Sequence, residues 1–204
     1  MPPSEHDHDS SRADQRPPDN PCLRVRPAAG KDVLELRELV RDTAGRGVCF
    51  AASPAVALYT RRMLGRLDMA LAAAAAKPLE DRVFVATDQD DLPVGVGAIH
   101  RDGPRCYLHL FNSSREGQGV GQALIAACLN HAREVWDCRW ALAEVFRQNE
   151  RGMRFWFAAE FNAAAERPSL GLPGASLVLL ARALLRNRAS RLTTRHRGGS
   201  CCLR

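Results

Sequence analysis

A glycine-rich run at residues 115–124 constrains the fold of this 204-residue chain more than any other feature. Its three glycines stand at alternate positions between an apolar, strand-like run, Cys106–Phe111, and an amphipathic run that ends near Val135. A glycine-rich turn from a strand into a helix leaves backbone N–H groups unpaired and open to a ligand. The helix start adds a partial positive charge, so the run predicts an anion site, most often for phosphate.

Two familiar nucleotide-binding motifs do not fit this run. A P-loop requires Lys and then Ser or Thr after its last glycine, whereas Gln122 and Ala123 follow Gly121 here. A dinucleotide fingerprint requires the spacing Gly-x-Gly-x-x-Gly after a first strand. In this chain the third glycine comes one residue early and in mid-chain, so the phosphate ligand is of another kind.

A second run follows after one more strand-like segment. It holds Asn149, Gly152 three residues on, and the aromatic pair Phe155–Trp156, with Phe161 five residues later. In this order the two runs resemble the acyl-CoA motifs of the GCN5-related N-acetyltransferases, the GNAT family. The family's first motif is Gln or Arg, two residues, Gly, one residue, then Gly or Ala. Its second motif is Asn, a small residue, an aromatic pair and often Gly-Phe.

Three residues depart from the family pattern. Glu116 stands where the first motif begins with Gln or Arg, and Arg115 is one place too early. Trp156 takes the place where the family often has Tyr, and Glu160 the place where Gly is usual. A carboxylate beside a pyrophosphate costs about 1 kcal/mol in exposed surroundings, unless Glu116 points to solvent or pairs with Arg115.

The resemblance covers about residues 22–184 and implies one mixed α/β domain, with a central, mostly antiparallel sheet flanked by helices. Residues 1–21 are rich in Pro, Asp, Ser and His and are predicted to form a disordered tail. Residues 185–204 are predicted to form a basic, disordered tail.

Hydrophobic periodicity and turn residues predict the elements within the domain. A helix capped by Asp32 and a second helix from Ser53–Pro54 to the alanine tract 72–76 precede most of the sheet. The predicted strands are Leu23–Arg26, Arg82–Thr87, Pro93–His100, Arg105–Phe111 and Trp140–Phe146, with helices after Gly119 and over Asn149–Ala159. Ala175–Leu184 suits either a strand or a helix.

The resemblance implies acetyl-CoA as the co-substrate and direct attack of an amine on its thioester. A backbone N–H at Phe111 or its neighbours would stabilise the oxyanion. Asn149 would hydrogen-bond the CoA arm, or only cap its helix. The residues implied to bind the cofactor are Phe111, Glu116, Gly117, Gln118, Gly119, Val120, Gly121, Gln122, Asn149 and Trp156.

Three side chains are candidates for the general base: Tyr107 and His109 on the fourth strand, and Glu144 on the fifth. Imidazole has a pKa near neutrality, which suits proton transfer from an ammonium. Strict alternation places His109 on one strand face with Tyr107 and Phe111. Each of the three side chains could instead have only a structural role in its strand. In the family a Tyr often protonates the leaving CoA sulfur, but the indole of Trp156 cannot transfer a proton.

Composition excludes several classes of function. The net charge is +6, much of it from arginines near the C-terminus, and no aromatic residue interleaves them, so no specific nucleic acid is predicted. No apolar run reaches membrane-span length. The seven cysteines lack metal-binding spacing, so no metal site is predicted, and a reducing cytoplasm is the default.

Two hypotheses for the function stay open. The first is an acyl-CoA-dependent N-acyltransferase, most often an acetyltransferase, acting on a small-molecule or peptide amine. The second is a catalytically degenerate relative that binds acyl-CoA or regulates a partner. Glu116, Trp156 and Glu160 favour the second hypothesis, whereas the intact Gly119–Gly121 turn and Asn149 favour the first. The sequence does not decide the oligomeric state, and a homodimer stays open.

Overall fold

The computed structural model describes residues 23–44, 53–170 and 174–185. Its elements in chain order are β1 (Arg24–Pro27), η1 (Gly30–Asp32), α1 (Val33–Ala44), α2 (Ser53–Ala76), β2 (Asp81–Thr87), β3 (Pro93–Asp102), β4 (Arg105–Ser113), α3 (Val120–Glu134), β5 (Trp140–Phe146), α4 (Glu150–Ala158), β6 (Asn162–Pro168) and β7 (Ser176–Ala183). The two predicted tails, apart from residue 185, lie outside the described residues.

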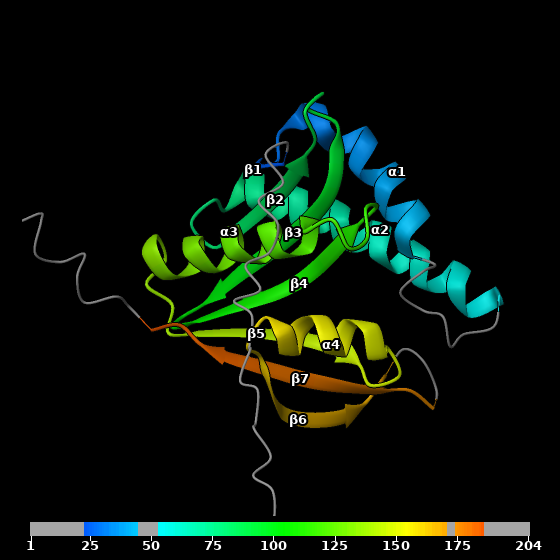
Figure 1. Ribbon diagram of the computed structural model, residues 1–204, viewed down its shortest axis with the longest axis vertical. Coiled ribbons are helices and arrows are strands. Elements are labelled where there is room, and N and C mark those ends of the chain that lie inside the picture. Colours follow the sequence, from blue (N-terminus) through cyan, green and yellow to red (C-terminus); the bar gives the residue numbers. More distant parts are fainter. Residues whose placement is uncertain (1–22, 45–52, 171–173, 186–204) are drawn as a thin grey trace, which may run out of the picture.

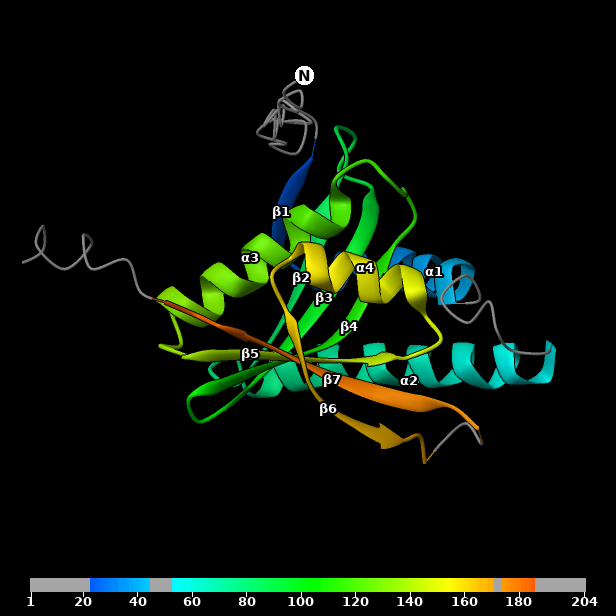
Figure 2. The ribbon, with the colours of Figure 1, turned by 60° about the horizontal axis from the view of Figure 1, so that its bottom comes forward.

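The seven strands form one sheet in the order β1-β2-β3-β4-β5-β7-β6. Every neighbouring pair is antiparallel except β4 and β5, which are parallel and are joined through α3. Helices α3 and α4 cover one face, and α1 and α2 lie on the other (Figures 1 and 2). The prediction of a mixed α/β fold with a mostly antiparallel sheet is therefore confirmed.

Each face of the sheet has its own hydrophobic core. The core under α3 includes Val120, Leu124 and Cys128, whose four-residue spacing turns one stripe of the helix inward. The core on the other face includes Leu36 and Val40 of α1 and Leu67 of α2. Strands β2 to β4 lie between the two cores, which is why apolar residues succeed each other along them rather than strictly alternating with polar ones.

A β-bulge interrupts β4 at His109. Ala98 of β3 is paired with Leu110, and the next residue of β3, Ile99, is paired with Leu108, so His109 is the extra residue. The bulge shifts the alternation of the strand: Leu108 packs in the core under α3, whereas Leu110 packs in the core under α1 and α2.

Phe111 consequently lies on the α3 face. A Cβ atom added to Gly97 would come within 3.0 Å of the Phe111 ring and 3.4 Å of the sulfur of Cys128 on α3. Phe111 also packs against the core under α3, whereas His109 approaches Arg66 of α2. The prediction that His109 and Phe111 share a face is wrong, because it assumed strict alternation through the position of the bulge.

Strand pairing between β4 and β5 stops at the same place. The parallel register runs from Arg105–Trp140 to Leu108–Ala143 and no further, although β4 continues to Ser113 and β5 to Phe146. Beyond the bulge, β4 stays paired with β3, and β5 stays paired with β7. The two central strands therefore diverge and open a gap in the middle of the sheet.

The C-terminal strands differ from the prediction in one respect. Ala175–Leu184 forms a strand, β7, which was one of two alternatives. Strand β6 was not predicted, because all seven of its residues are exposed and its sequence, Asn-Ala-Ala-Ala-Glu-Arg-Pro, shows no apolar alternation. Alanine has a weak strand preference, so only pairing with β7 identifies this edge strand.

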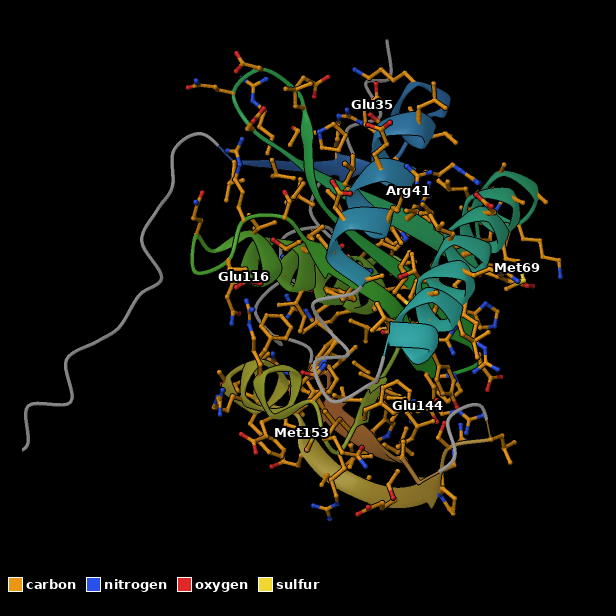
Figure 3. All side chains as sticks on the ribbon, turned by 90° about the vertical axis from the view of Figure 1, so that its right-hand side faces the viewer. Glu35, Arg41, Met69, Glu116, Glu144 and Met153 are labelled. Carbon is orange, nitrogen blue, oxygen red and sulfur yellow. The ribbon has the colours of Figure 1, made fainter. Side chains whose placement is uncertain are left out.

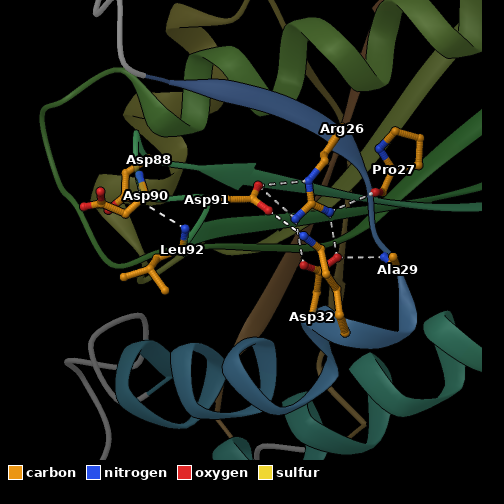
Figure 4. A network of polar contacts seen from close by, with 9 residues as sticks. Arg26, Pro27, Ala29, Asp32, Asp88, Asp90, Asp91 and Leu92 are labelled. Carbon is orange, nitrogen blue, oxygen red and sulfur yellow. Dashed lines mark hydrogen bonds and ion pairs between the residues drawn. The ribbon is translucent and has the colours of Figure 1, made fainter.

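Asp32 does not cap α1 as predicted. Its carboxylate accepts hydrogen bonds from the backbone N–H of Ala29, at 2.7 Å, and from the guanidinium of Arg26, at 2.7 and 2.8 Å (Figure 4). Arg26 and Lys31 also donate to Asp91 in the turn between β2 and β3. The Arg26 guanidinium, assisted by the Ala29 N–H, holds the pKa of Asp32 below its usual range. The network joins β1, η1 and this turn.

The close contact between β3 and α3 can be tested with a pair of glycine substitutions. A Cβ atom at Gly95 would lie 2.6 Å from Val120 Cγ1 and 2.9 Å from Leu124 Cδ1. We expect Gly95→Ala to lower the free energy of unfolding by about 1–3 kcal/mol, as overpacked cores do. Gly65→Ala is the control, because nothing lies within 4 Å of its Cβ position in α2.

Gly65→Ala should leave stability unchanged or raise it by about 1 kcal/mol, from helix propensity. Urea denaturation of both variants provides the comparison. A Gly95→Ala protein as stable as Gly65→Ala would contradict the packing described.

Candidate active site

A cavity of about 340 Å³ lies where β4 and β5 diverge. Strand β4 supplies His109 and Phe111, and β5 supplies Glu144; Figure 3 shows Glu144 between α2 and the strands β6 and β7. The complete lining is Leu58, Tyr59, Arg62, Met63, Arg66, Leu108, His109, Leu110, Phe111, Glu144, Val145, Phe146, Asn149, Trp156, Arg167, Ser169, Leu170 and Leu177. Residues from α2 and from α4 both line it, so the cavity connects the two faces of the sheet through the gap.

The glycine-rich turn forms an open helix start beside this gap. Gly117 and Gly119 have φ angles of 70° and 77°, in the left-handed region that favours glycine. Ala123 makes the first intrahelical bond of α3, to the carbonyl of Gly119 at 2.9 Å, and no side chain caps the helix. The N–H groups of Val120, Gly121 and Gln122 therefore have no intrahelical acceptor and suit an anion. Nothing lies within 4 Å of a Cβ placed on Gly119.

The charge of Glu116 is neutralised from α4. Its carboxylate lies 2.5 Å from the guanidinium of Arg151, and Figure 3 shows Glu116 in the turn before α3. Arg115, the partner suggested by the sequence, pairs with Asp88 instead. The structure thus provides another counterion for Glu116, which weakens the argument from this residue against anion binding.

Gly121 and Gly152 leave no room for a side chain, the first because two helices approach there and the second because of a helix cap. A Cβ atom on Gly121 would come within 2.9 Å of the Phe155 ring on α4, so this glycine allows α3 and α4 to approach. A Cβ on Gly152 would lie 2.6 Å from the side chain of Asn149. Asn149 caps α4, because its Oδ1 accepts a hydrogen bond of 2.9 Å from the Gly152 N–H. Asn149 also lines the cavity.

Trp156 forms the floor of the cavity on the α4 side. The indole is 6% exposed and makes edge contacts with Phe111, at 5.2 Å between ring centroids, with Phe161, at 5.0 Å, and with Phe155. This aromatic cluster positions α4 against β4. The side chain shapes the cavity wall and supplies no titrating group.

Two of the three candidate bases lie in the cavity. His109 lines it, and burial together with the nearby charge of Arg66 lowers its pKa to about 4, so the imidazole is neutral at pH 7. Glu144 also lines it, and accepts a hydrogen bond of 2.8 Å from Arg167 of β6. Tyr107 does not line the cavity; it pairs with His100 across the sheet, and the guanidinium of Arg105 lies 5.9 Å from its ring centroid.

Sequence reasoning missed the contribution of α2 and β6. Tyr59, Arg62 and Arg66 line the cavity from one stripe of α2, and Arg167 lines it from β6. The sequence held a signal for this contribution. The spacing of three and then four residues between Tyr59, Arg62 and Arg66 places an aromatic and two basic groups on one helix face. Burial raises the pKa of Tyr59, whose ring packs edge-on against Phe146 at 6.1 Å.

Glu160 occupies a position that glycine would fill without strain. Its φ angle is 61°, in the left-handed region, at the end of α4. This geometry explains why glycine is usual at this place in the motif. The carboxylate of Glu160 pairs with Arg182 of β7 at 2.5 Å, so its departure from the motif concerns the backbone and a surface ion pair rather than the cavity.

The model of the Acetyltransferase (GNAT) family matches residues 48–161, and the chain belongs to this family. The matched segment runs from before α2 to the end of the aromatic cluster. It includes the glycine turn, the divergent strands and the Asn149–Trp156 motif. A search of curated protein sequences found no match.

Solved structures show the same fold. PaiA N-acetyltransferase from Thermoplasma acidophilum, solved with coenzyme A, is 14% identical and covers 79% of this chain and 98% of its own, with a TM-score of 0.66. YncA from Salmonella typhimurium, solved with its cofactor acetyl-CoA, is 17% identical over 82% and 96%, with a TM-score of 0.60. Spermidine N-acetyltransferase from Vibrio cholerae, solved with CoA and spermine, is 14% identical over 81% and 97%, with a TM-score of 0.59.

No helix among the described residues has both the length and the apolar content needed to cross a membrane.

Because the pKa of His109 is lowered in the folded protein, we expect the free energy of unfolding to depend on pH. Between pH 6.5 and 4 the unfolded chain binds a proton at this residue and the folded chain does not, so the free energy of unfolding falls as the pH falls. From pH 7.5 to 5.0 this residue accounts for a loss of up to about 2 kcal/mol. Besides Arg66, the charged groups that act on it are Asp81 and His100.

His109→Gln should therefore lose less stability than the parent over that pH range. Denaturant unfolding at the two pH values measures the difference, with Tyr107→Phe as a control on the same strand. Equal losses in His109→Gln and the parent would contradict a partly buried, neutral imidazole.

Proposed function

We propose that this protein is an acetyl-CoA-dependent N-acetyltransferase that transfers the acetyl group to a primary amine. The observation that carries the proposal is the cavity at the divergence of β4 and β5, beside the open start of α3. One end of the cavity is lined by α4 and the other by α2, so a thioester from one side and an amine from the other can meet within the sheet.

The cofactor is proposed to bind along α3 and α4. Its pyrophosphate would lie on the N–H groups of Val120, Gly121 and Gln122, at the positive end of the α3 dipole. Its arm would then pass Asn149 and Trp156 into the gap. PaiA solved with coenzyme A and YncA solved with acetyl-CoA, both on the same fold, support the choice of acetyl-CoA as the cofactor.

The reaction is proposed to be a direct displacement. The lone pair of the amine attacks the thioester carbonyl, a C–N bond forms, and the C–S bond breaks as the sulfur leaves. The amine loses one proton and the sulfur gains one, so the products are an amide and free CoA thiol. Backbone N–H groups of β4 near Phe111, beyond the last residue paired with β5, are proposed to stabilise the oxyanion.

His109 is proposed as the group that accepts the amine proton. It lines the cavity, and its imidazole is uncharged at neutral pH, so a lone pair is available. Glu144 is the less favourable base, because its carboxylate is held by Arg167. Trp156 cannot supply a proton to the sulfur, and we propose that water does so.

Further features of the function are proposals of the same kind. The acceptor is a small-molecule or peptide amine. The enzyme consists of a single catalytic domain that spans residues 22–184. Cys106, Cys128 and Cys138 are buried free thiols, which suit a reducing cytoplasm. Assembly into a homodimer is also proposed; that proteins with this fold can form homo-oligomers is supported by the dodecameric spermidine N-acetyltransferase from Vibrio cholerae.

Cofactor binding tests the first part of the proposal. Gly119→Trp places an indole into the open space over the α3 start and should abolish acetyl-CoA binding measured by titration calorimetry. Gly103→Trp is the matched control, because Gly103 also has a positive φ, of 56°, with nothing within 4 Å of its Cβ, but lies in the β3–β4 turn. Equal affinity in the two variants, or no binding by the parent, would contradict the proposed cradle.

The role of His109 can be separated from cofactor binding. We expect His109→Gln to lower kcat by about 10- to 100-fold, because loss of a general base has effects of this order or larger. The affinity for acetyl-CoA should stay unchanged. Tyr107→Phe, outside the cavity, should keep its kcat. A thiol-release assay measures all three proteins, and an unchanged kcat in His109→Gln would remove it as the base.

A further inference from the structure

The charges that line the cavity do not balance. Three guanidinium groups line it, those of Arg62, Arg66 and Arg167, against the single carboxylate of Glu144. Arg167 uses that carboxylate, at 2.8 Å. Since His109 is neutral, arginines outnumber carboxylates among the lining side chains at pH 7 (three arginines against one glutamate).

Arg66 stands out among these groups. Within the part of the chain that the structure describes, it makes no ion pair and no hydrogen bond to a carboxylate, whereas Arg37, which lies nearby on α1, reaches Asp68 of α2 at 2.5 Å. Arg66 and Tyr59 lie close enough for the arginine charge to act on the phenol, and the same charge acts on His109. The basic group of Arg66 and the uncharged hydrogen-bonding groups of Tyr59 and His109 thus line the same cavity.

The proposed cofactor does not account for this excess charge. The phosphates of CoA would lie at the start of α3, and none of residues 114–122 lines the cavity. The part of acetyl-CoA that would enter the gap, the thioester and the end of its arm, is uncharged. The positive lining on α2 is therefore left for the second substrate.

We propose that the acceptor is an amine that also carries an acidic group, a carboxylate, phosphate or sulfonate, and that Arg66 and Arg62 bind this group while the amine points to His109. Guanidinium groups bind such oxyanions with paired hydrogen bonds, which fix orientation as well as charge. The inference rests on the proposed acetyl transfer and adds the class of the acceptor. A polyamine, the acceptor named for the Vibrio cholerae neighbour, would be repelled by this lining.

An acidic group of the acceptor bound beside Arg66 would also change the basicity of His109. An anion beside Arg66 offsets the positive charge that helps to keep His109 unprotonated. Binding of the acceptor would therefore make His109 a stronger base at the moment when the amine must lose its proton. This coupling favours acceptors that bear the acid over amines of the same size that lack it.

Binding of reaction products tests the proposal without relying on turnover. We would titrate the protein, with and without saturating CoA, with three matched pairs: N-acetylglycine and its amide, N-acetyl-β-alanine and its amide, and 2-acetamidoethyl phosphate and N-acetylethanolamine. These probes have no basic amine, so the members of each pair differ in the acidic group: a carboxylate is compared with its neutral amide, and a phosphate with the free hydroxyl. Calorimetry or ligand-observed NMR gives the affinities, and Arg66→Gln, Arg62→Gln and Arg61→Gln are measured beside the parent.

We expect the acid of at least one pair to bind about tenfold or more tightly than its neutral mate. Arg66→Gln should abolish most of that preference, and Arg62→Gln part of it. Arg61→Gln should keep it, because Arg61 is exposed on α2 and does not line the cavity. The pair with the largest ratio shows whether a carboxylate or a phosphate is preferred.

Equal binding of acids and their neutral mates would overturn the assignment, and so would a preference for acids that survives in the double variant Arg66→Gln, Arg62→Gln. A third contrary result would be no binding of any acid at about 20 mM, a concentration well above the dissociation constants of functional sites. If acetyl-CoA binds normally in those cases, the acetyltransferase proposal stands and only the acceptor class fails. If acids bind but acetyl-CoA does not, both the transferase proposal and the acceptor assignment fail.

Discussion

The extra residue in β4 at His109 is the feature on which the site depends. A bulge shifts the alternation of a strand and bends it, and here it also marks the end of the pairing between β4 and β5. Without it, parallel pairing could continue past Leu108 and fill the space with backbone hydrogen bonds. The bulge places His109 on the α2 side and turns Phe111 to the α3 side, so a single irregularity supplies both walls of one cavity.

Electrostatics then distinguish the two sides of that gap. On the α3 side, the charges near the glycine turn are balanced: Arg151 neutralises Glu116, and Asp88 holds Arg115, so the helix dipole alone attracts an anion. On the α2 side, Arg167 uses the carboxylate of Glu144, and Arg66 is left to face the cavity. We therefore propose two anion sites, one built from backbone N–H groups and a second built from side chains, one for each of two substrates.

The sequence predicted the parts of the site that depend on local geometry. Gly117 and Gly119 adopt the positive φ angles expected of a strand-to-helix turn, and Asn149 begins α4 at the expected place. It could not predict the parts that depend on tertiary pairing. The bulge at His109 has no signature in Tyr-Leu-His-Leu-Phe, and so the face of Phe111 was predicted wrongly. Strand β6 exists only through β7, and Tyr59 and Arg66 approach the strands only after α2 packs on the sheet.

The divergence of β4 and β5 is proposed to receive the thioester. A crystal structure of the protein with coenzyme A would locate the cofactor. We expect the pyrophosphate on the N–H groups of Val120–Gln122 and the sulfur between Phe111 and Val145, with β4 and β5 unpaired beyond Leu108 and Ala143. Coenzyme A bound elsewhere, or a β4–β5 ladder that continues through His109, would contradict a thioester site at this divergence.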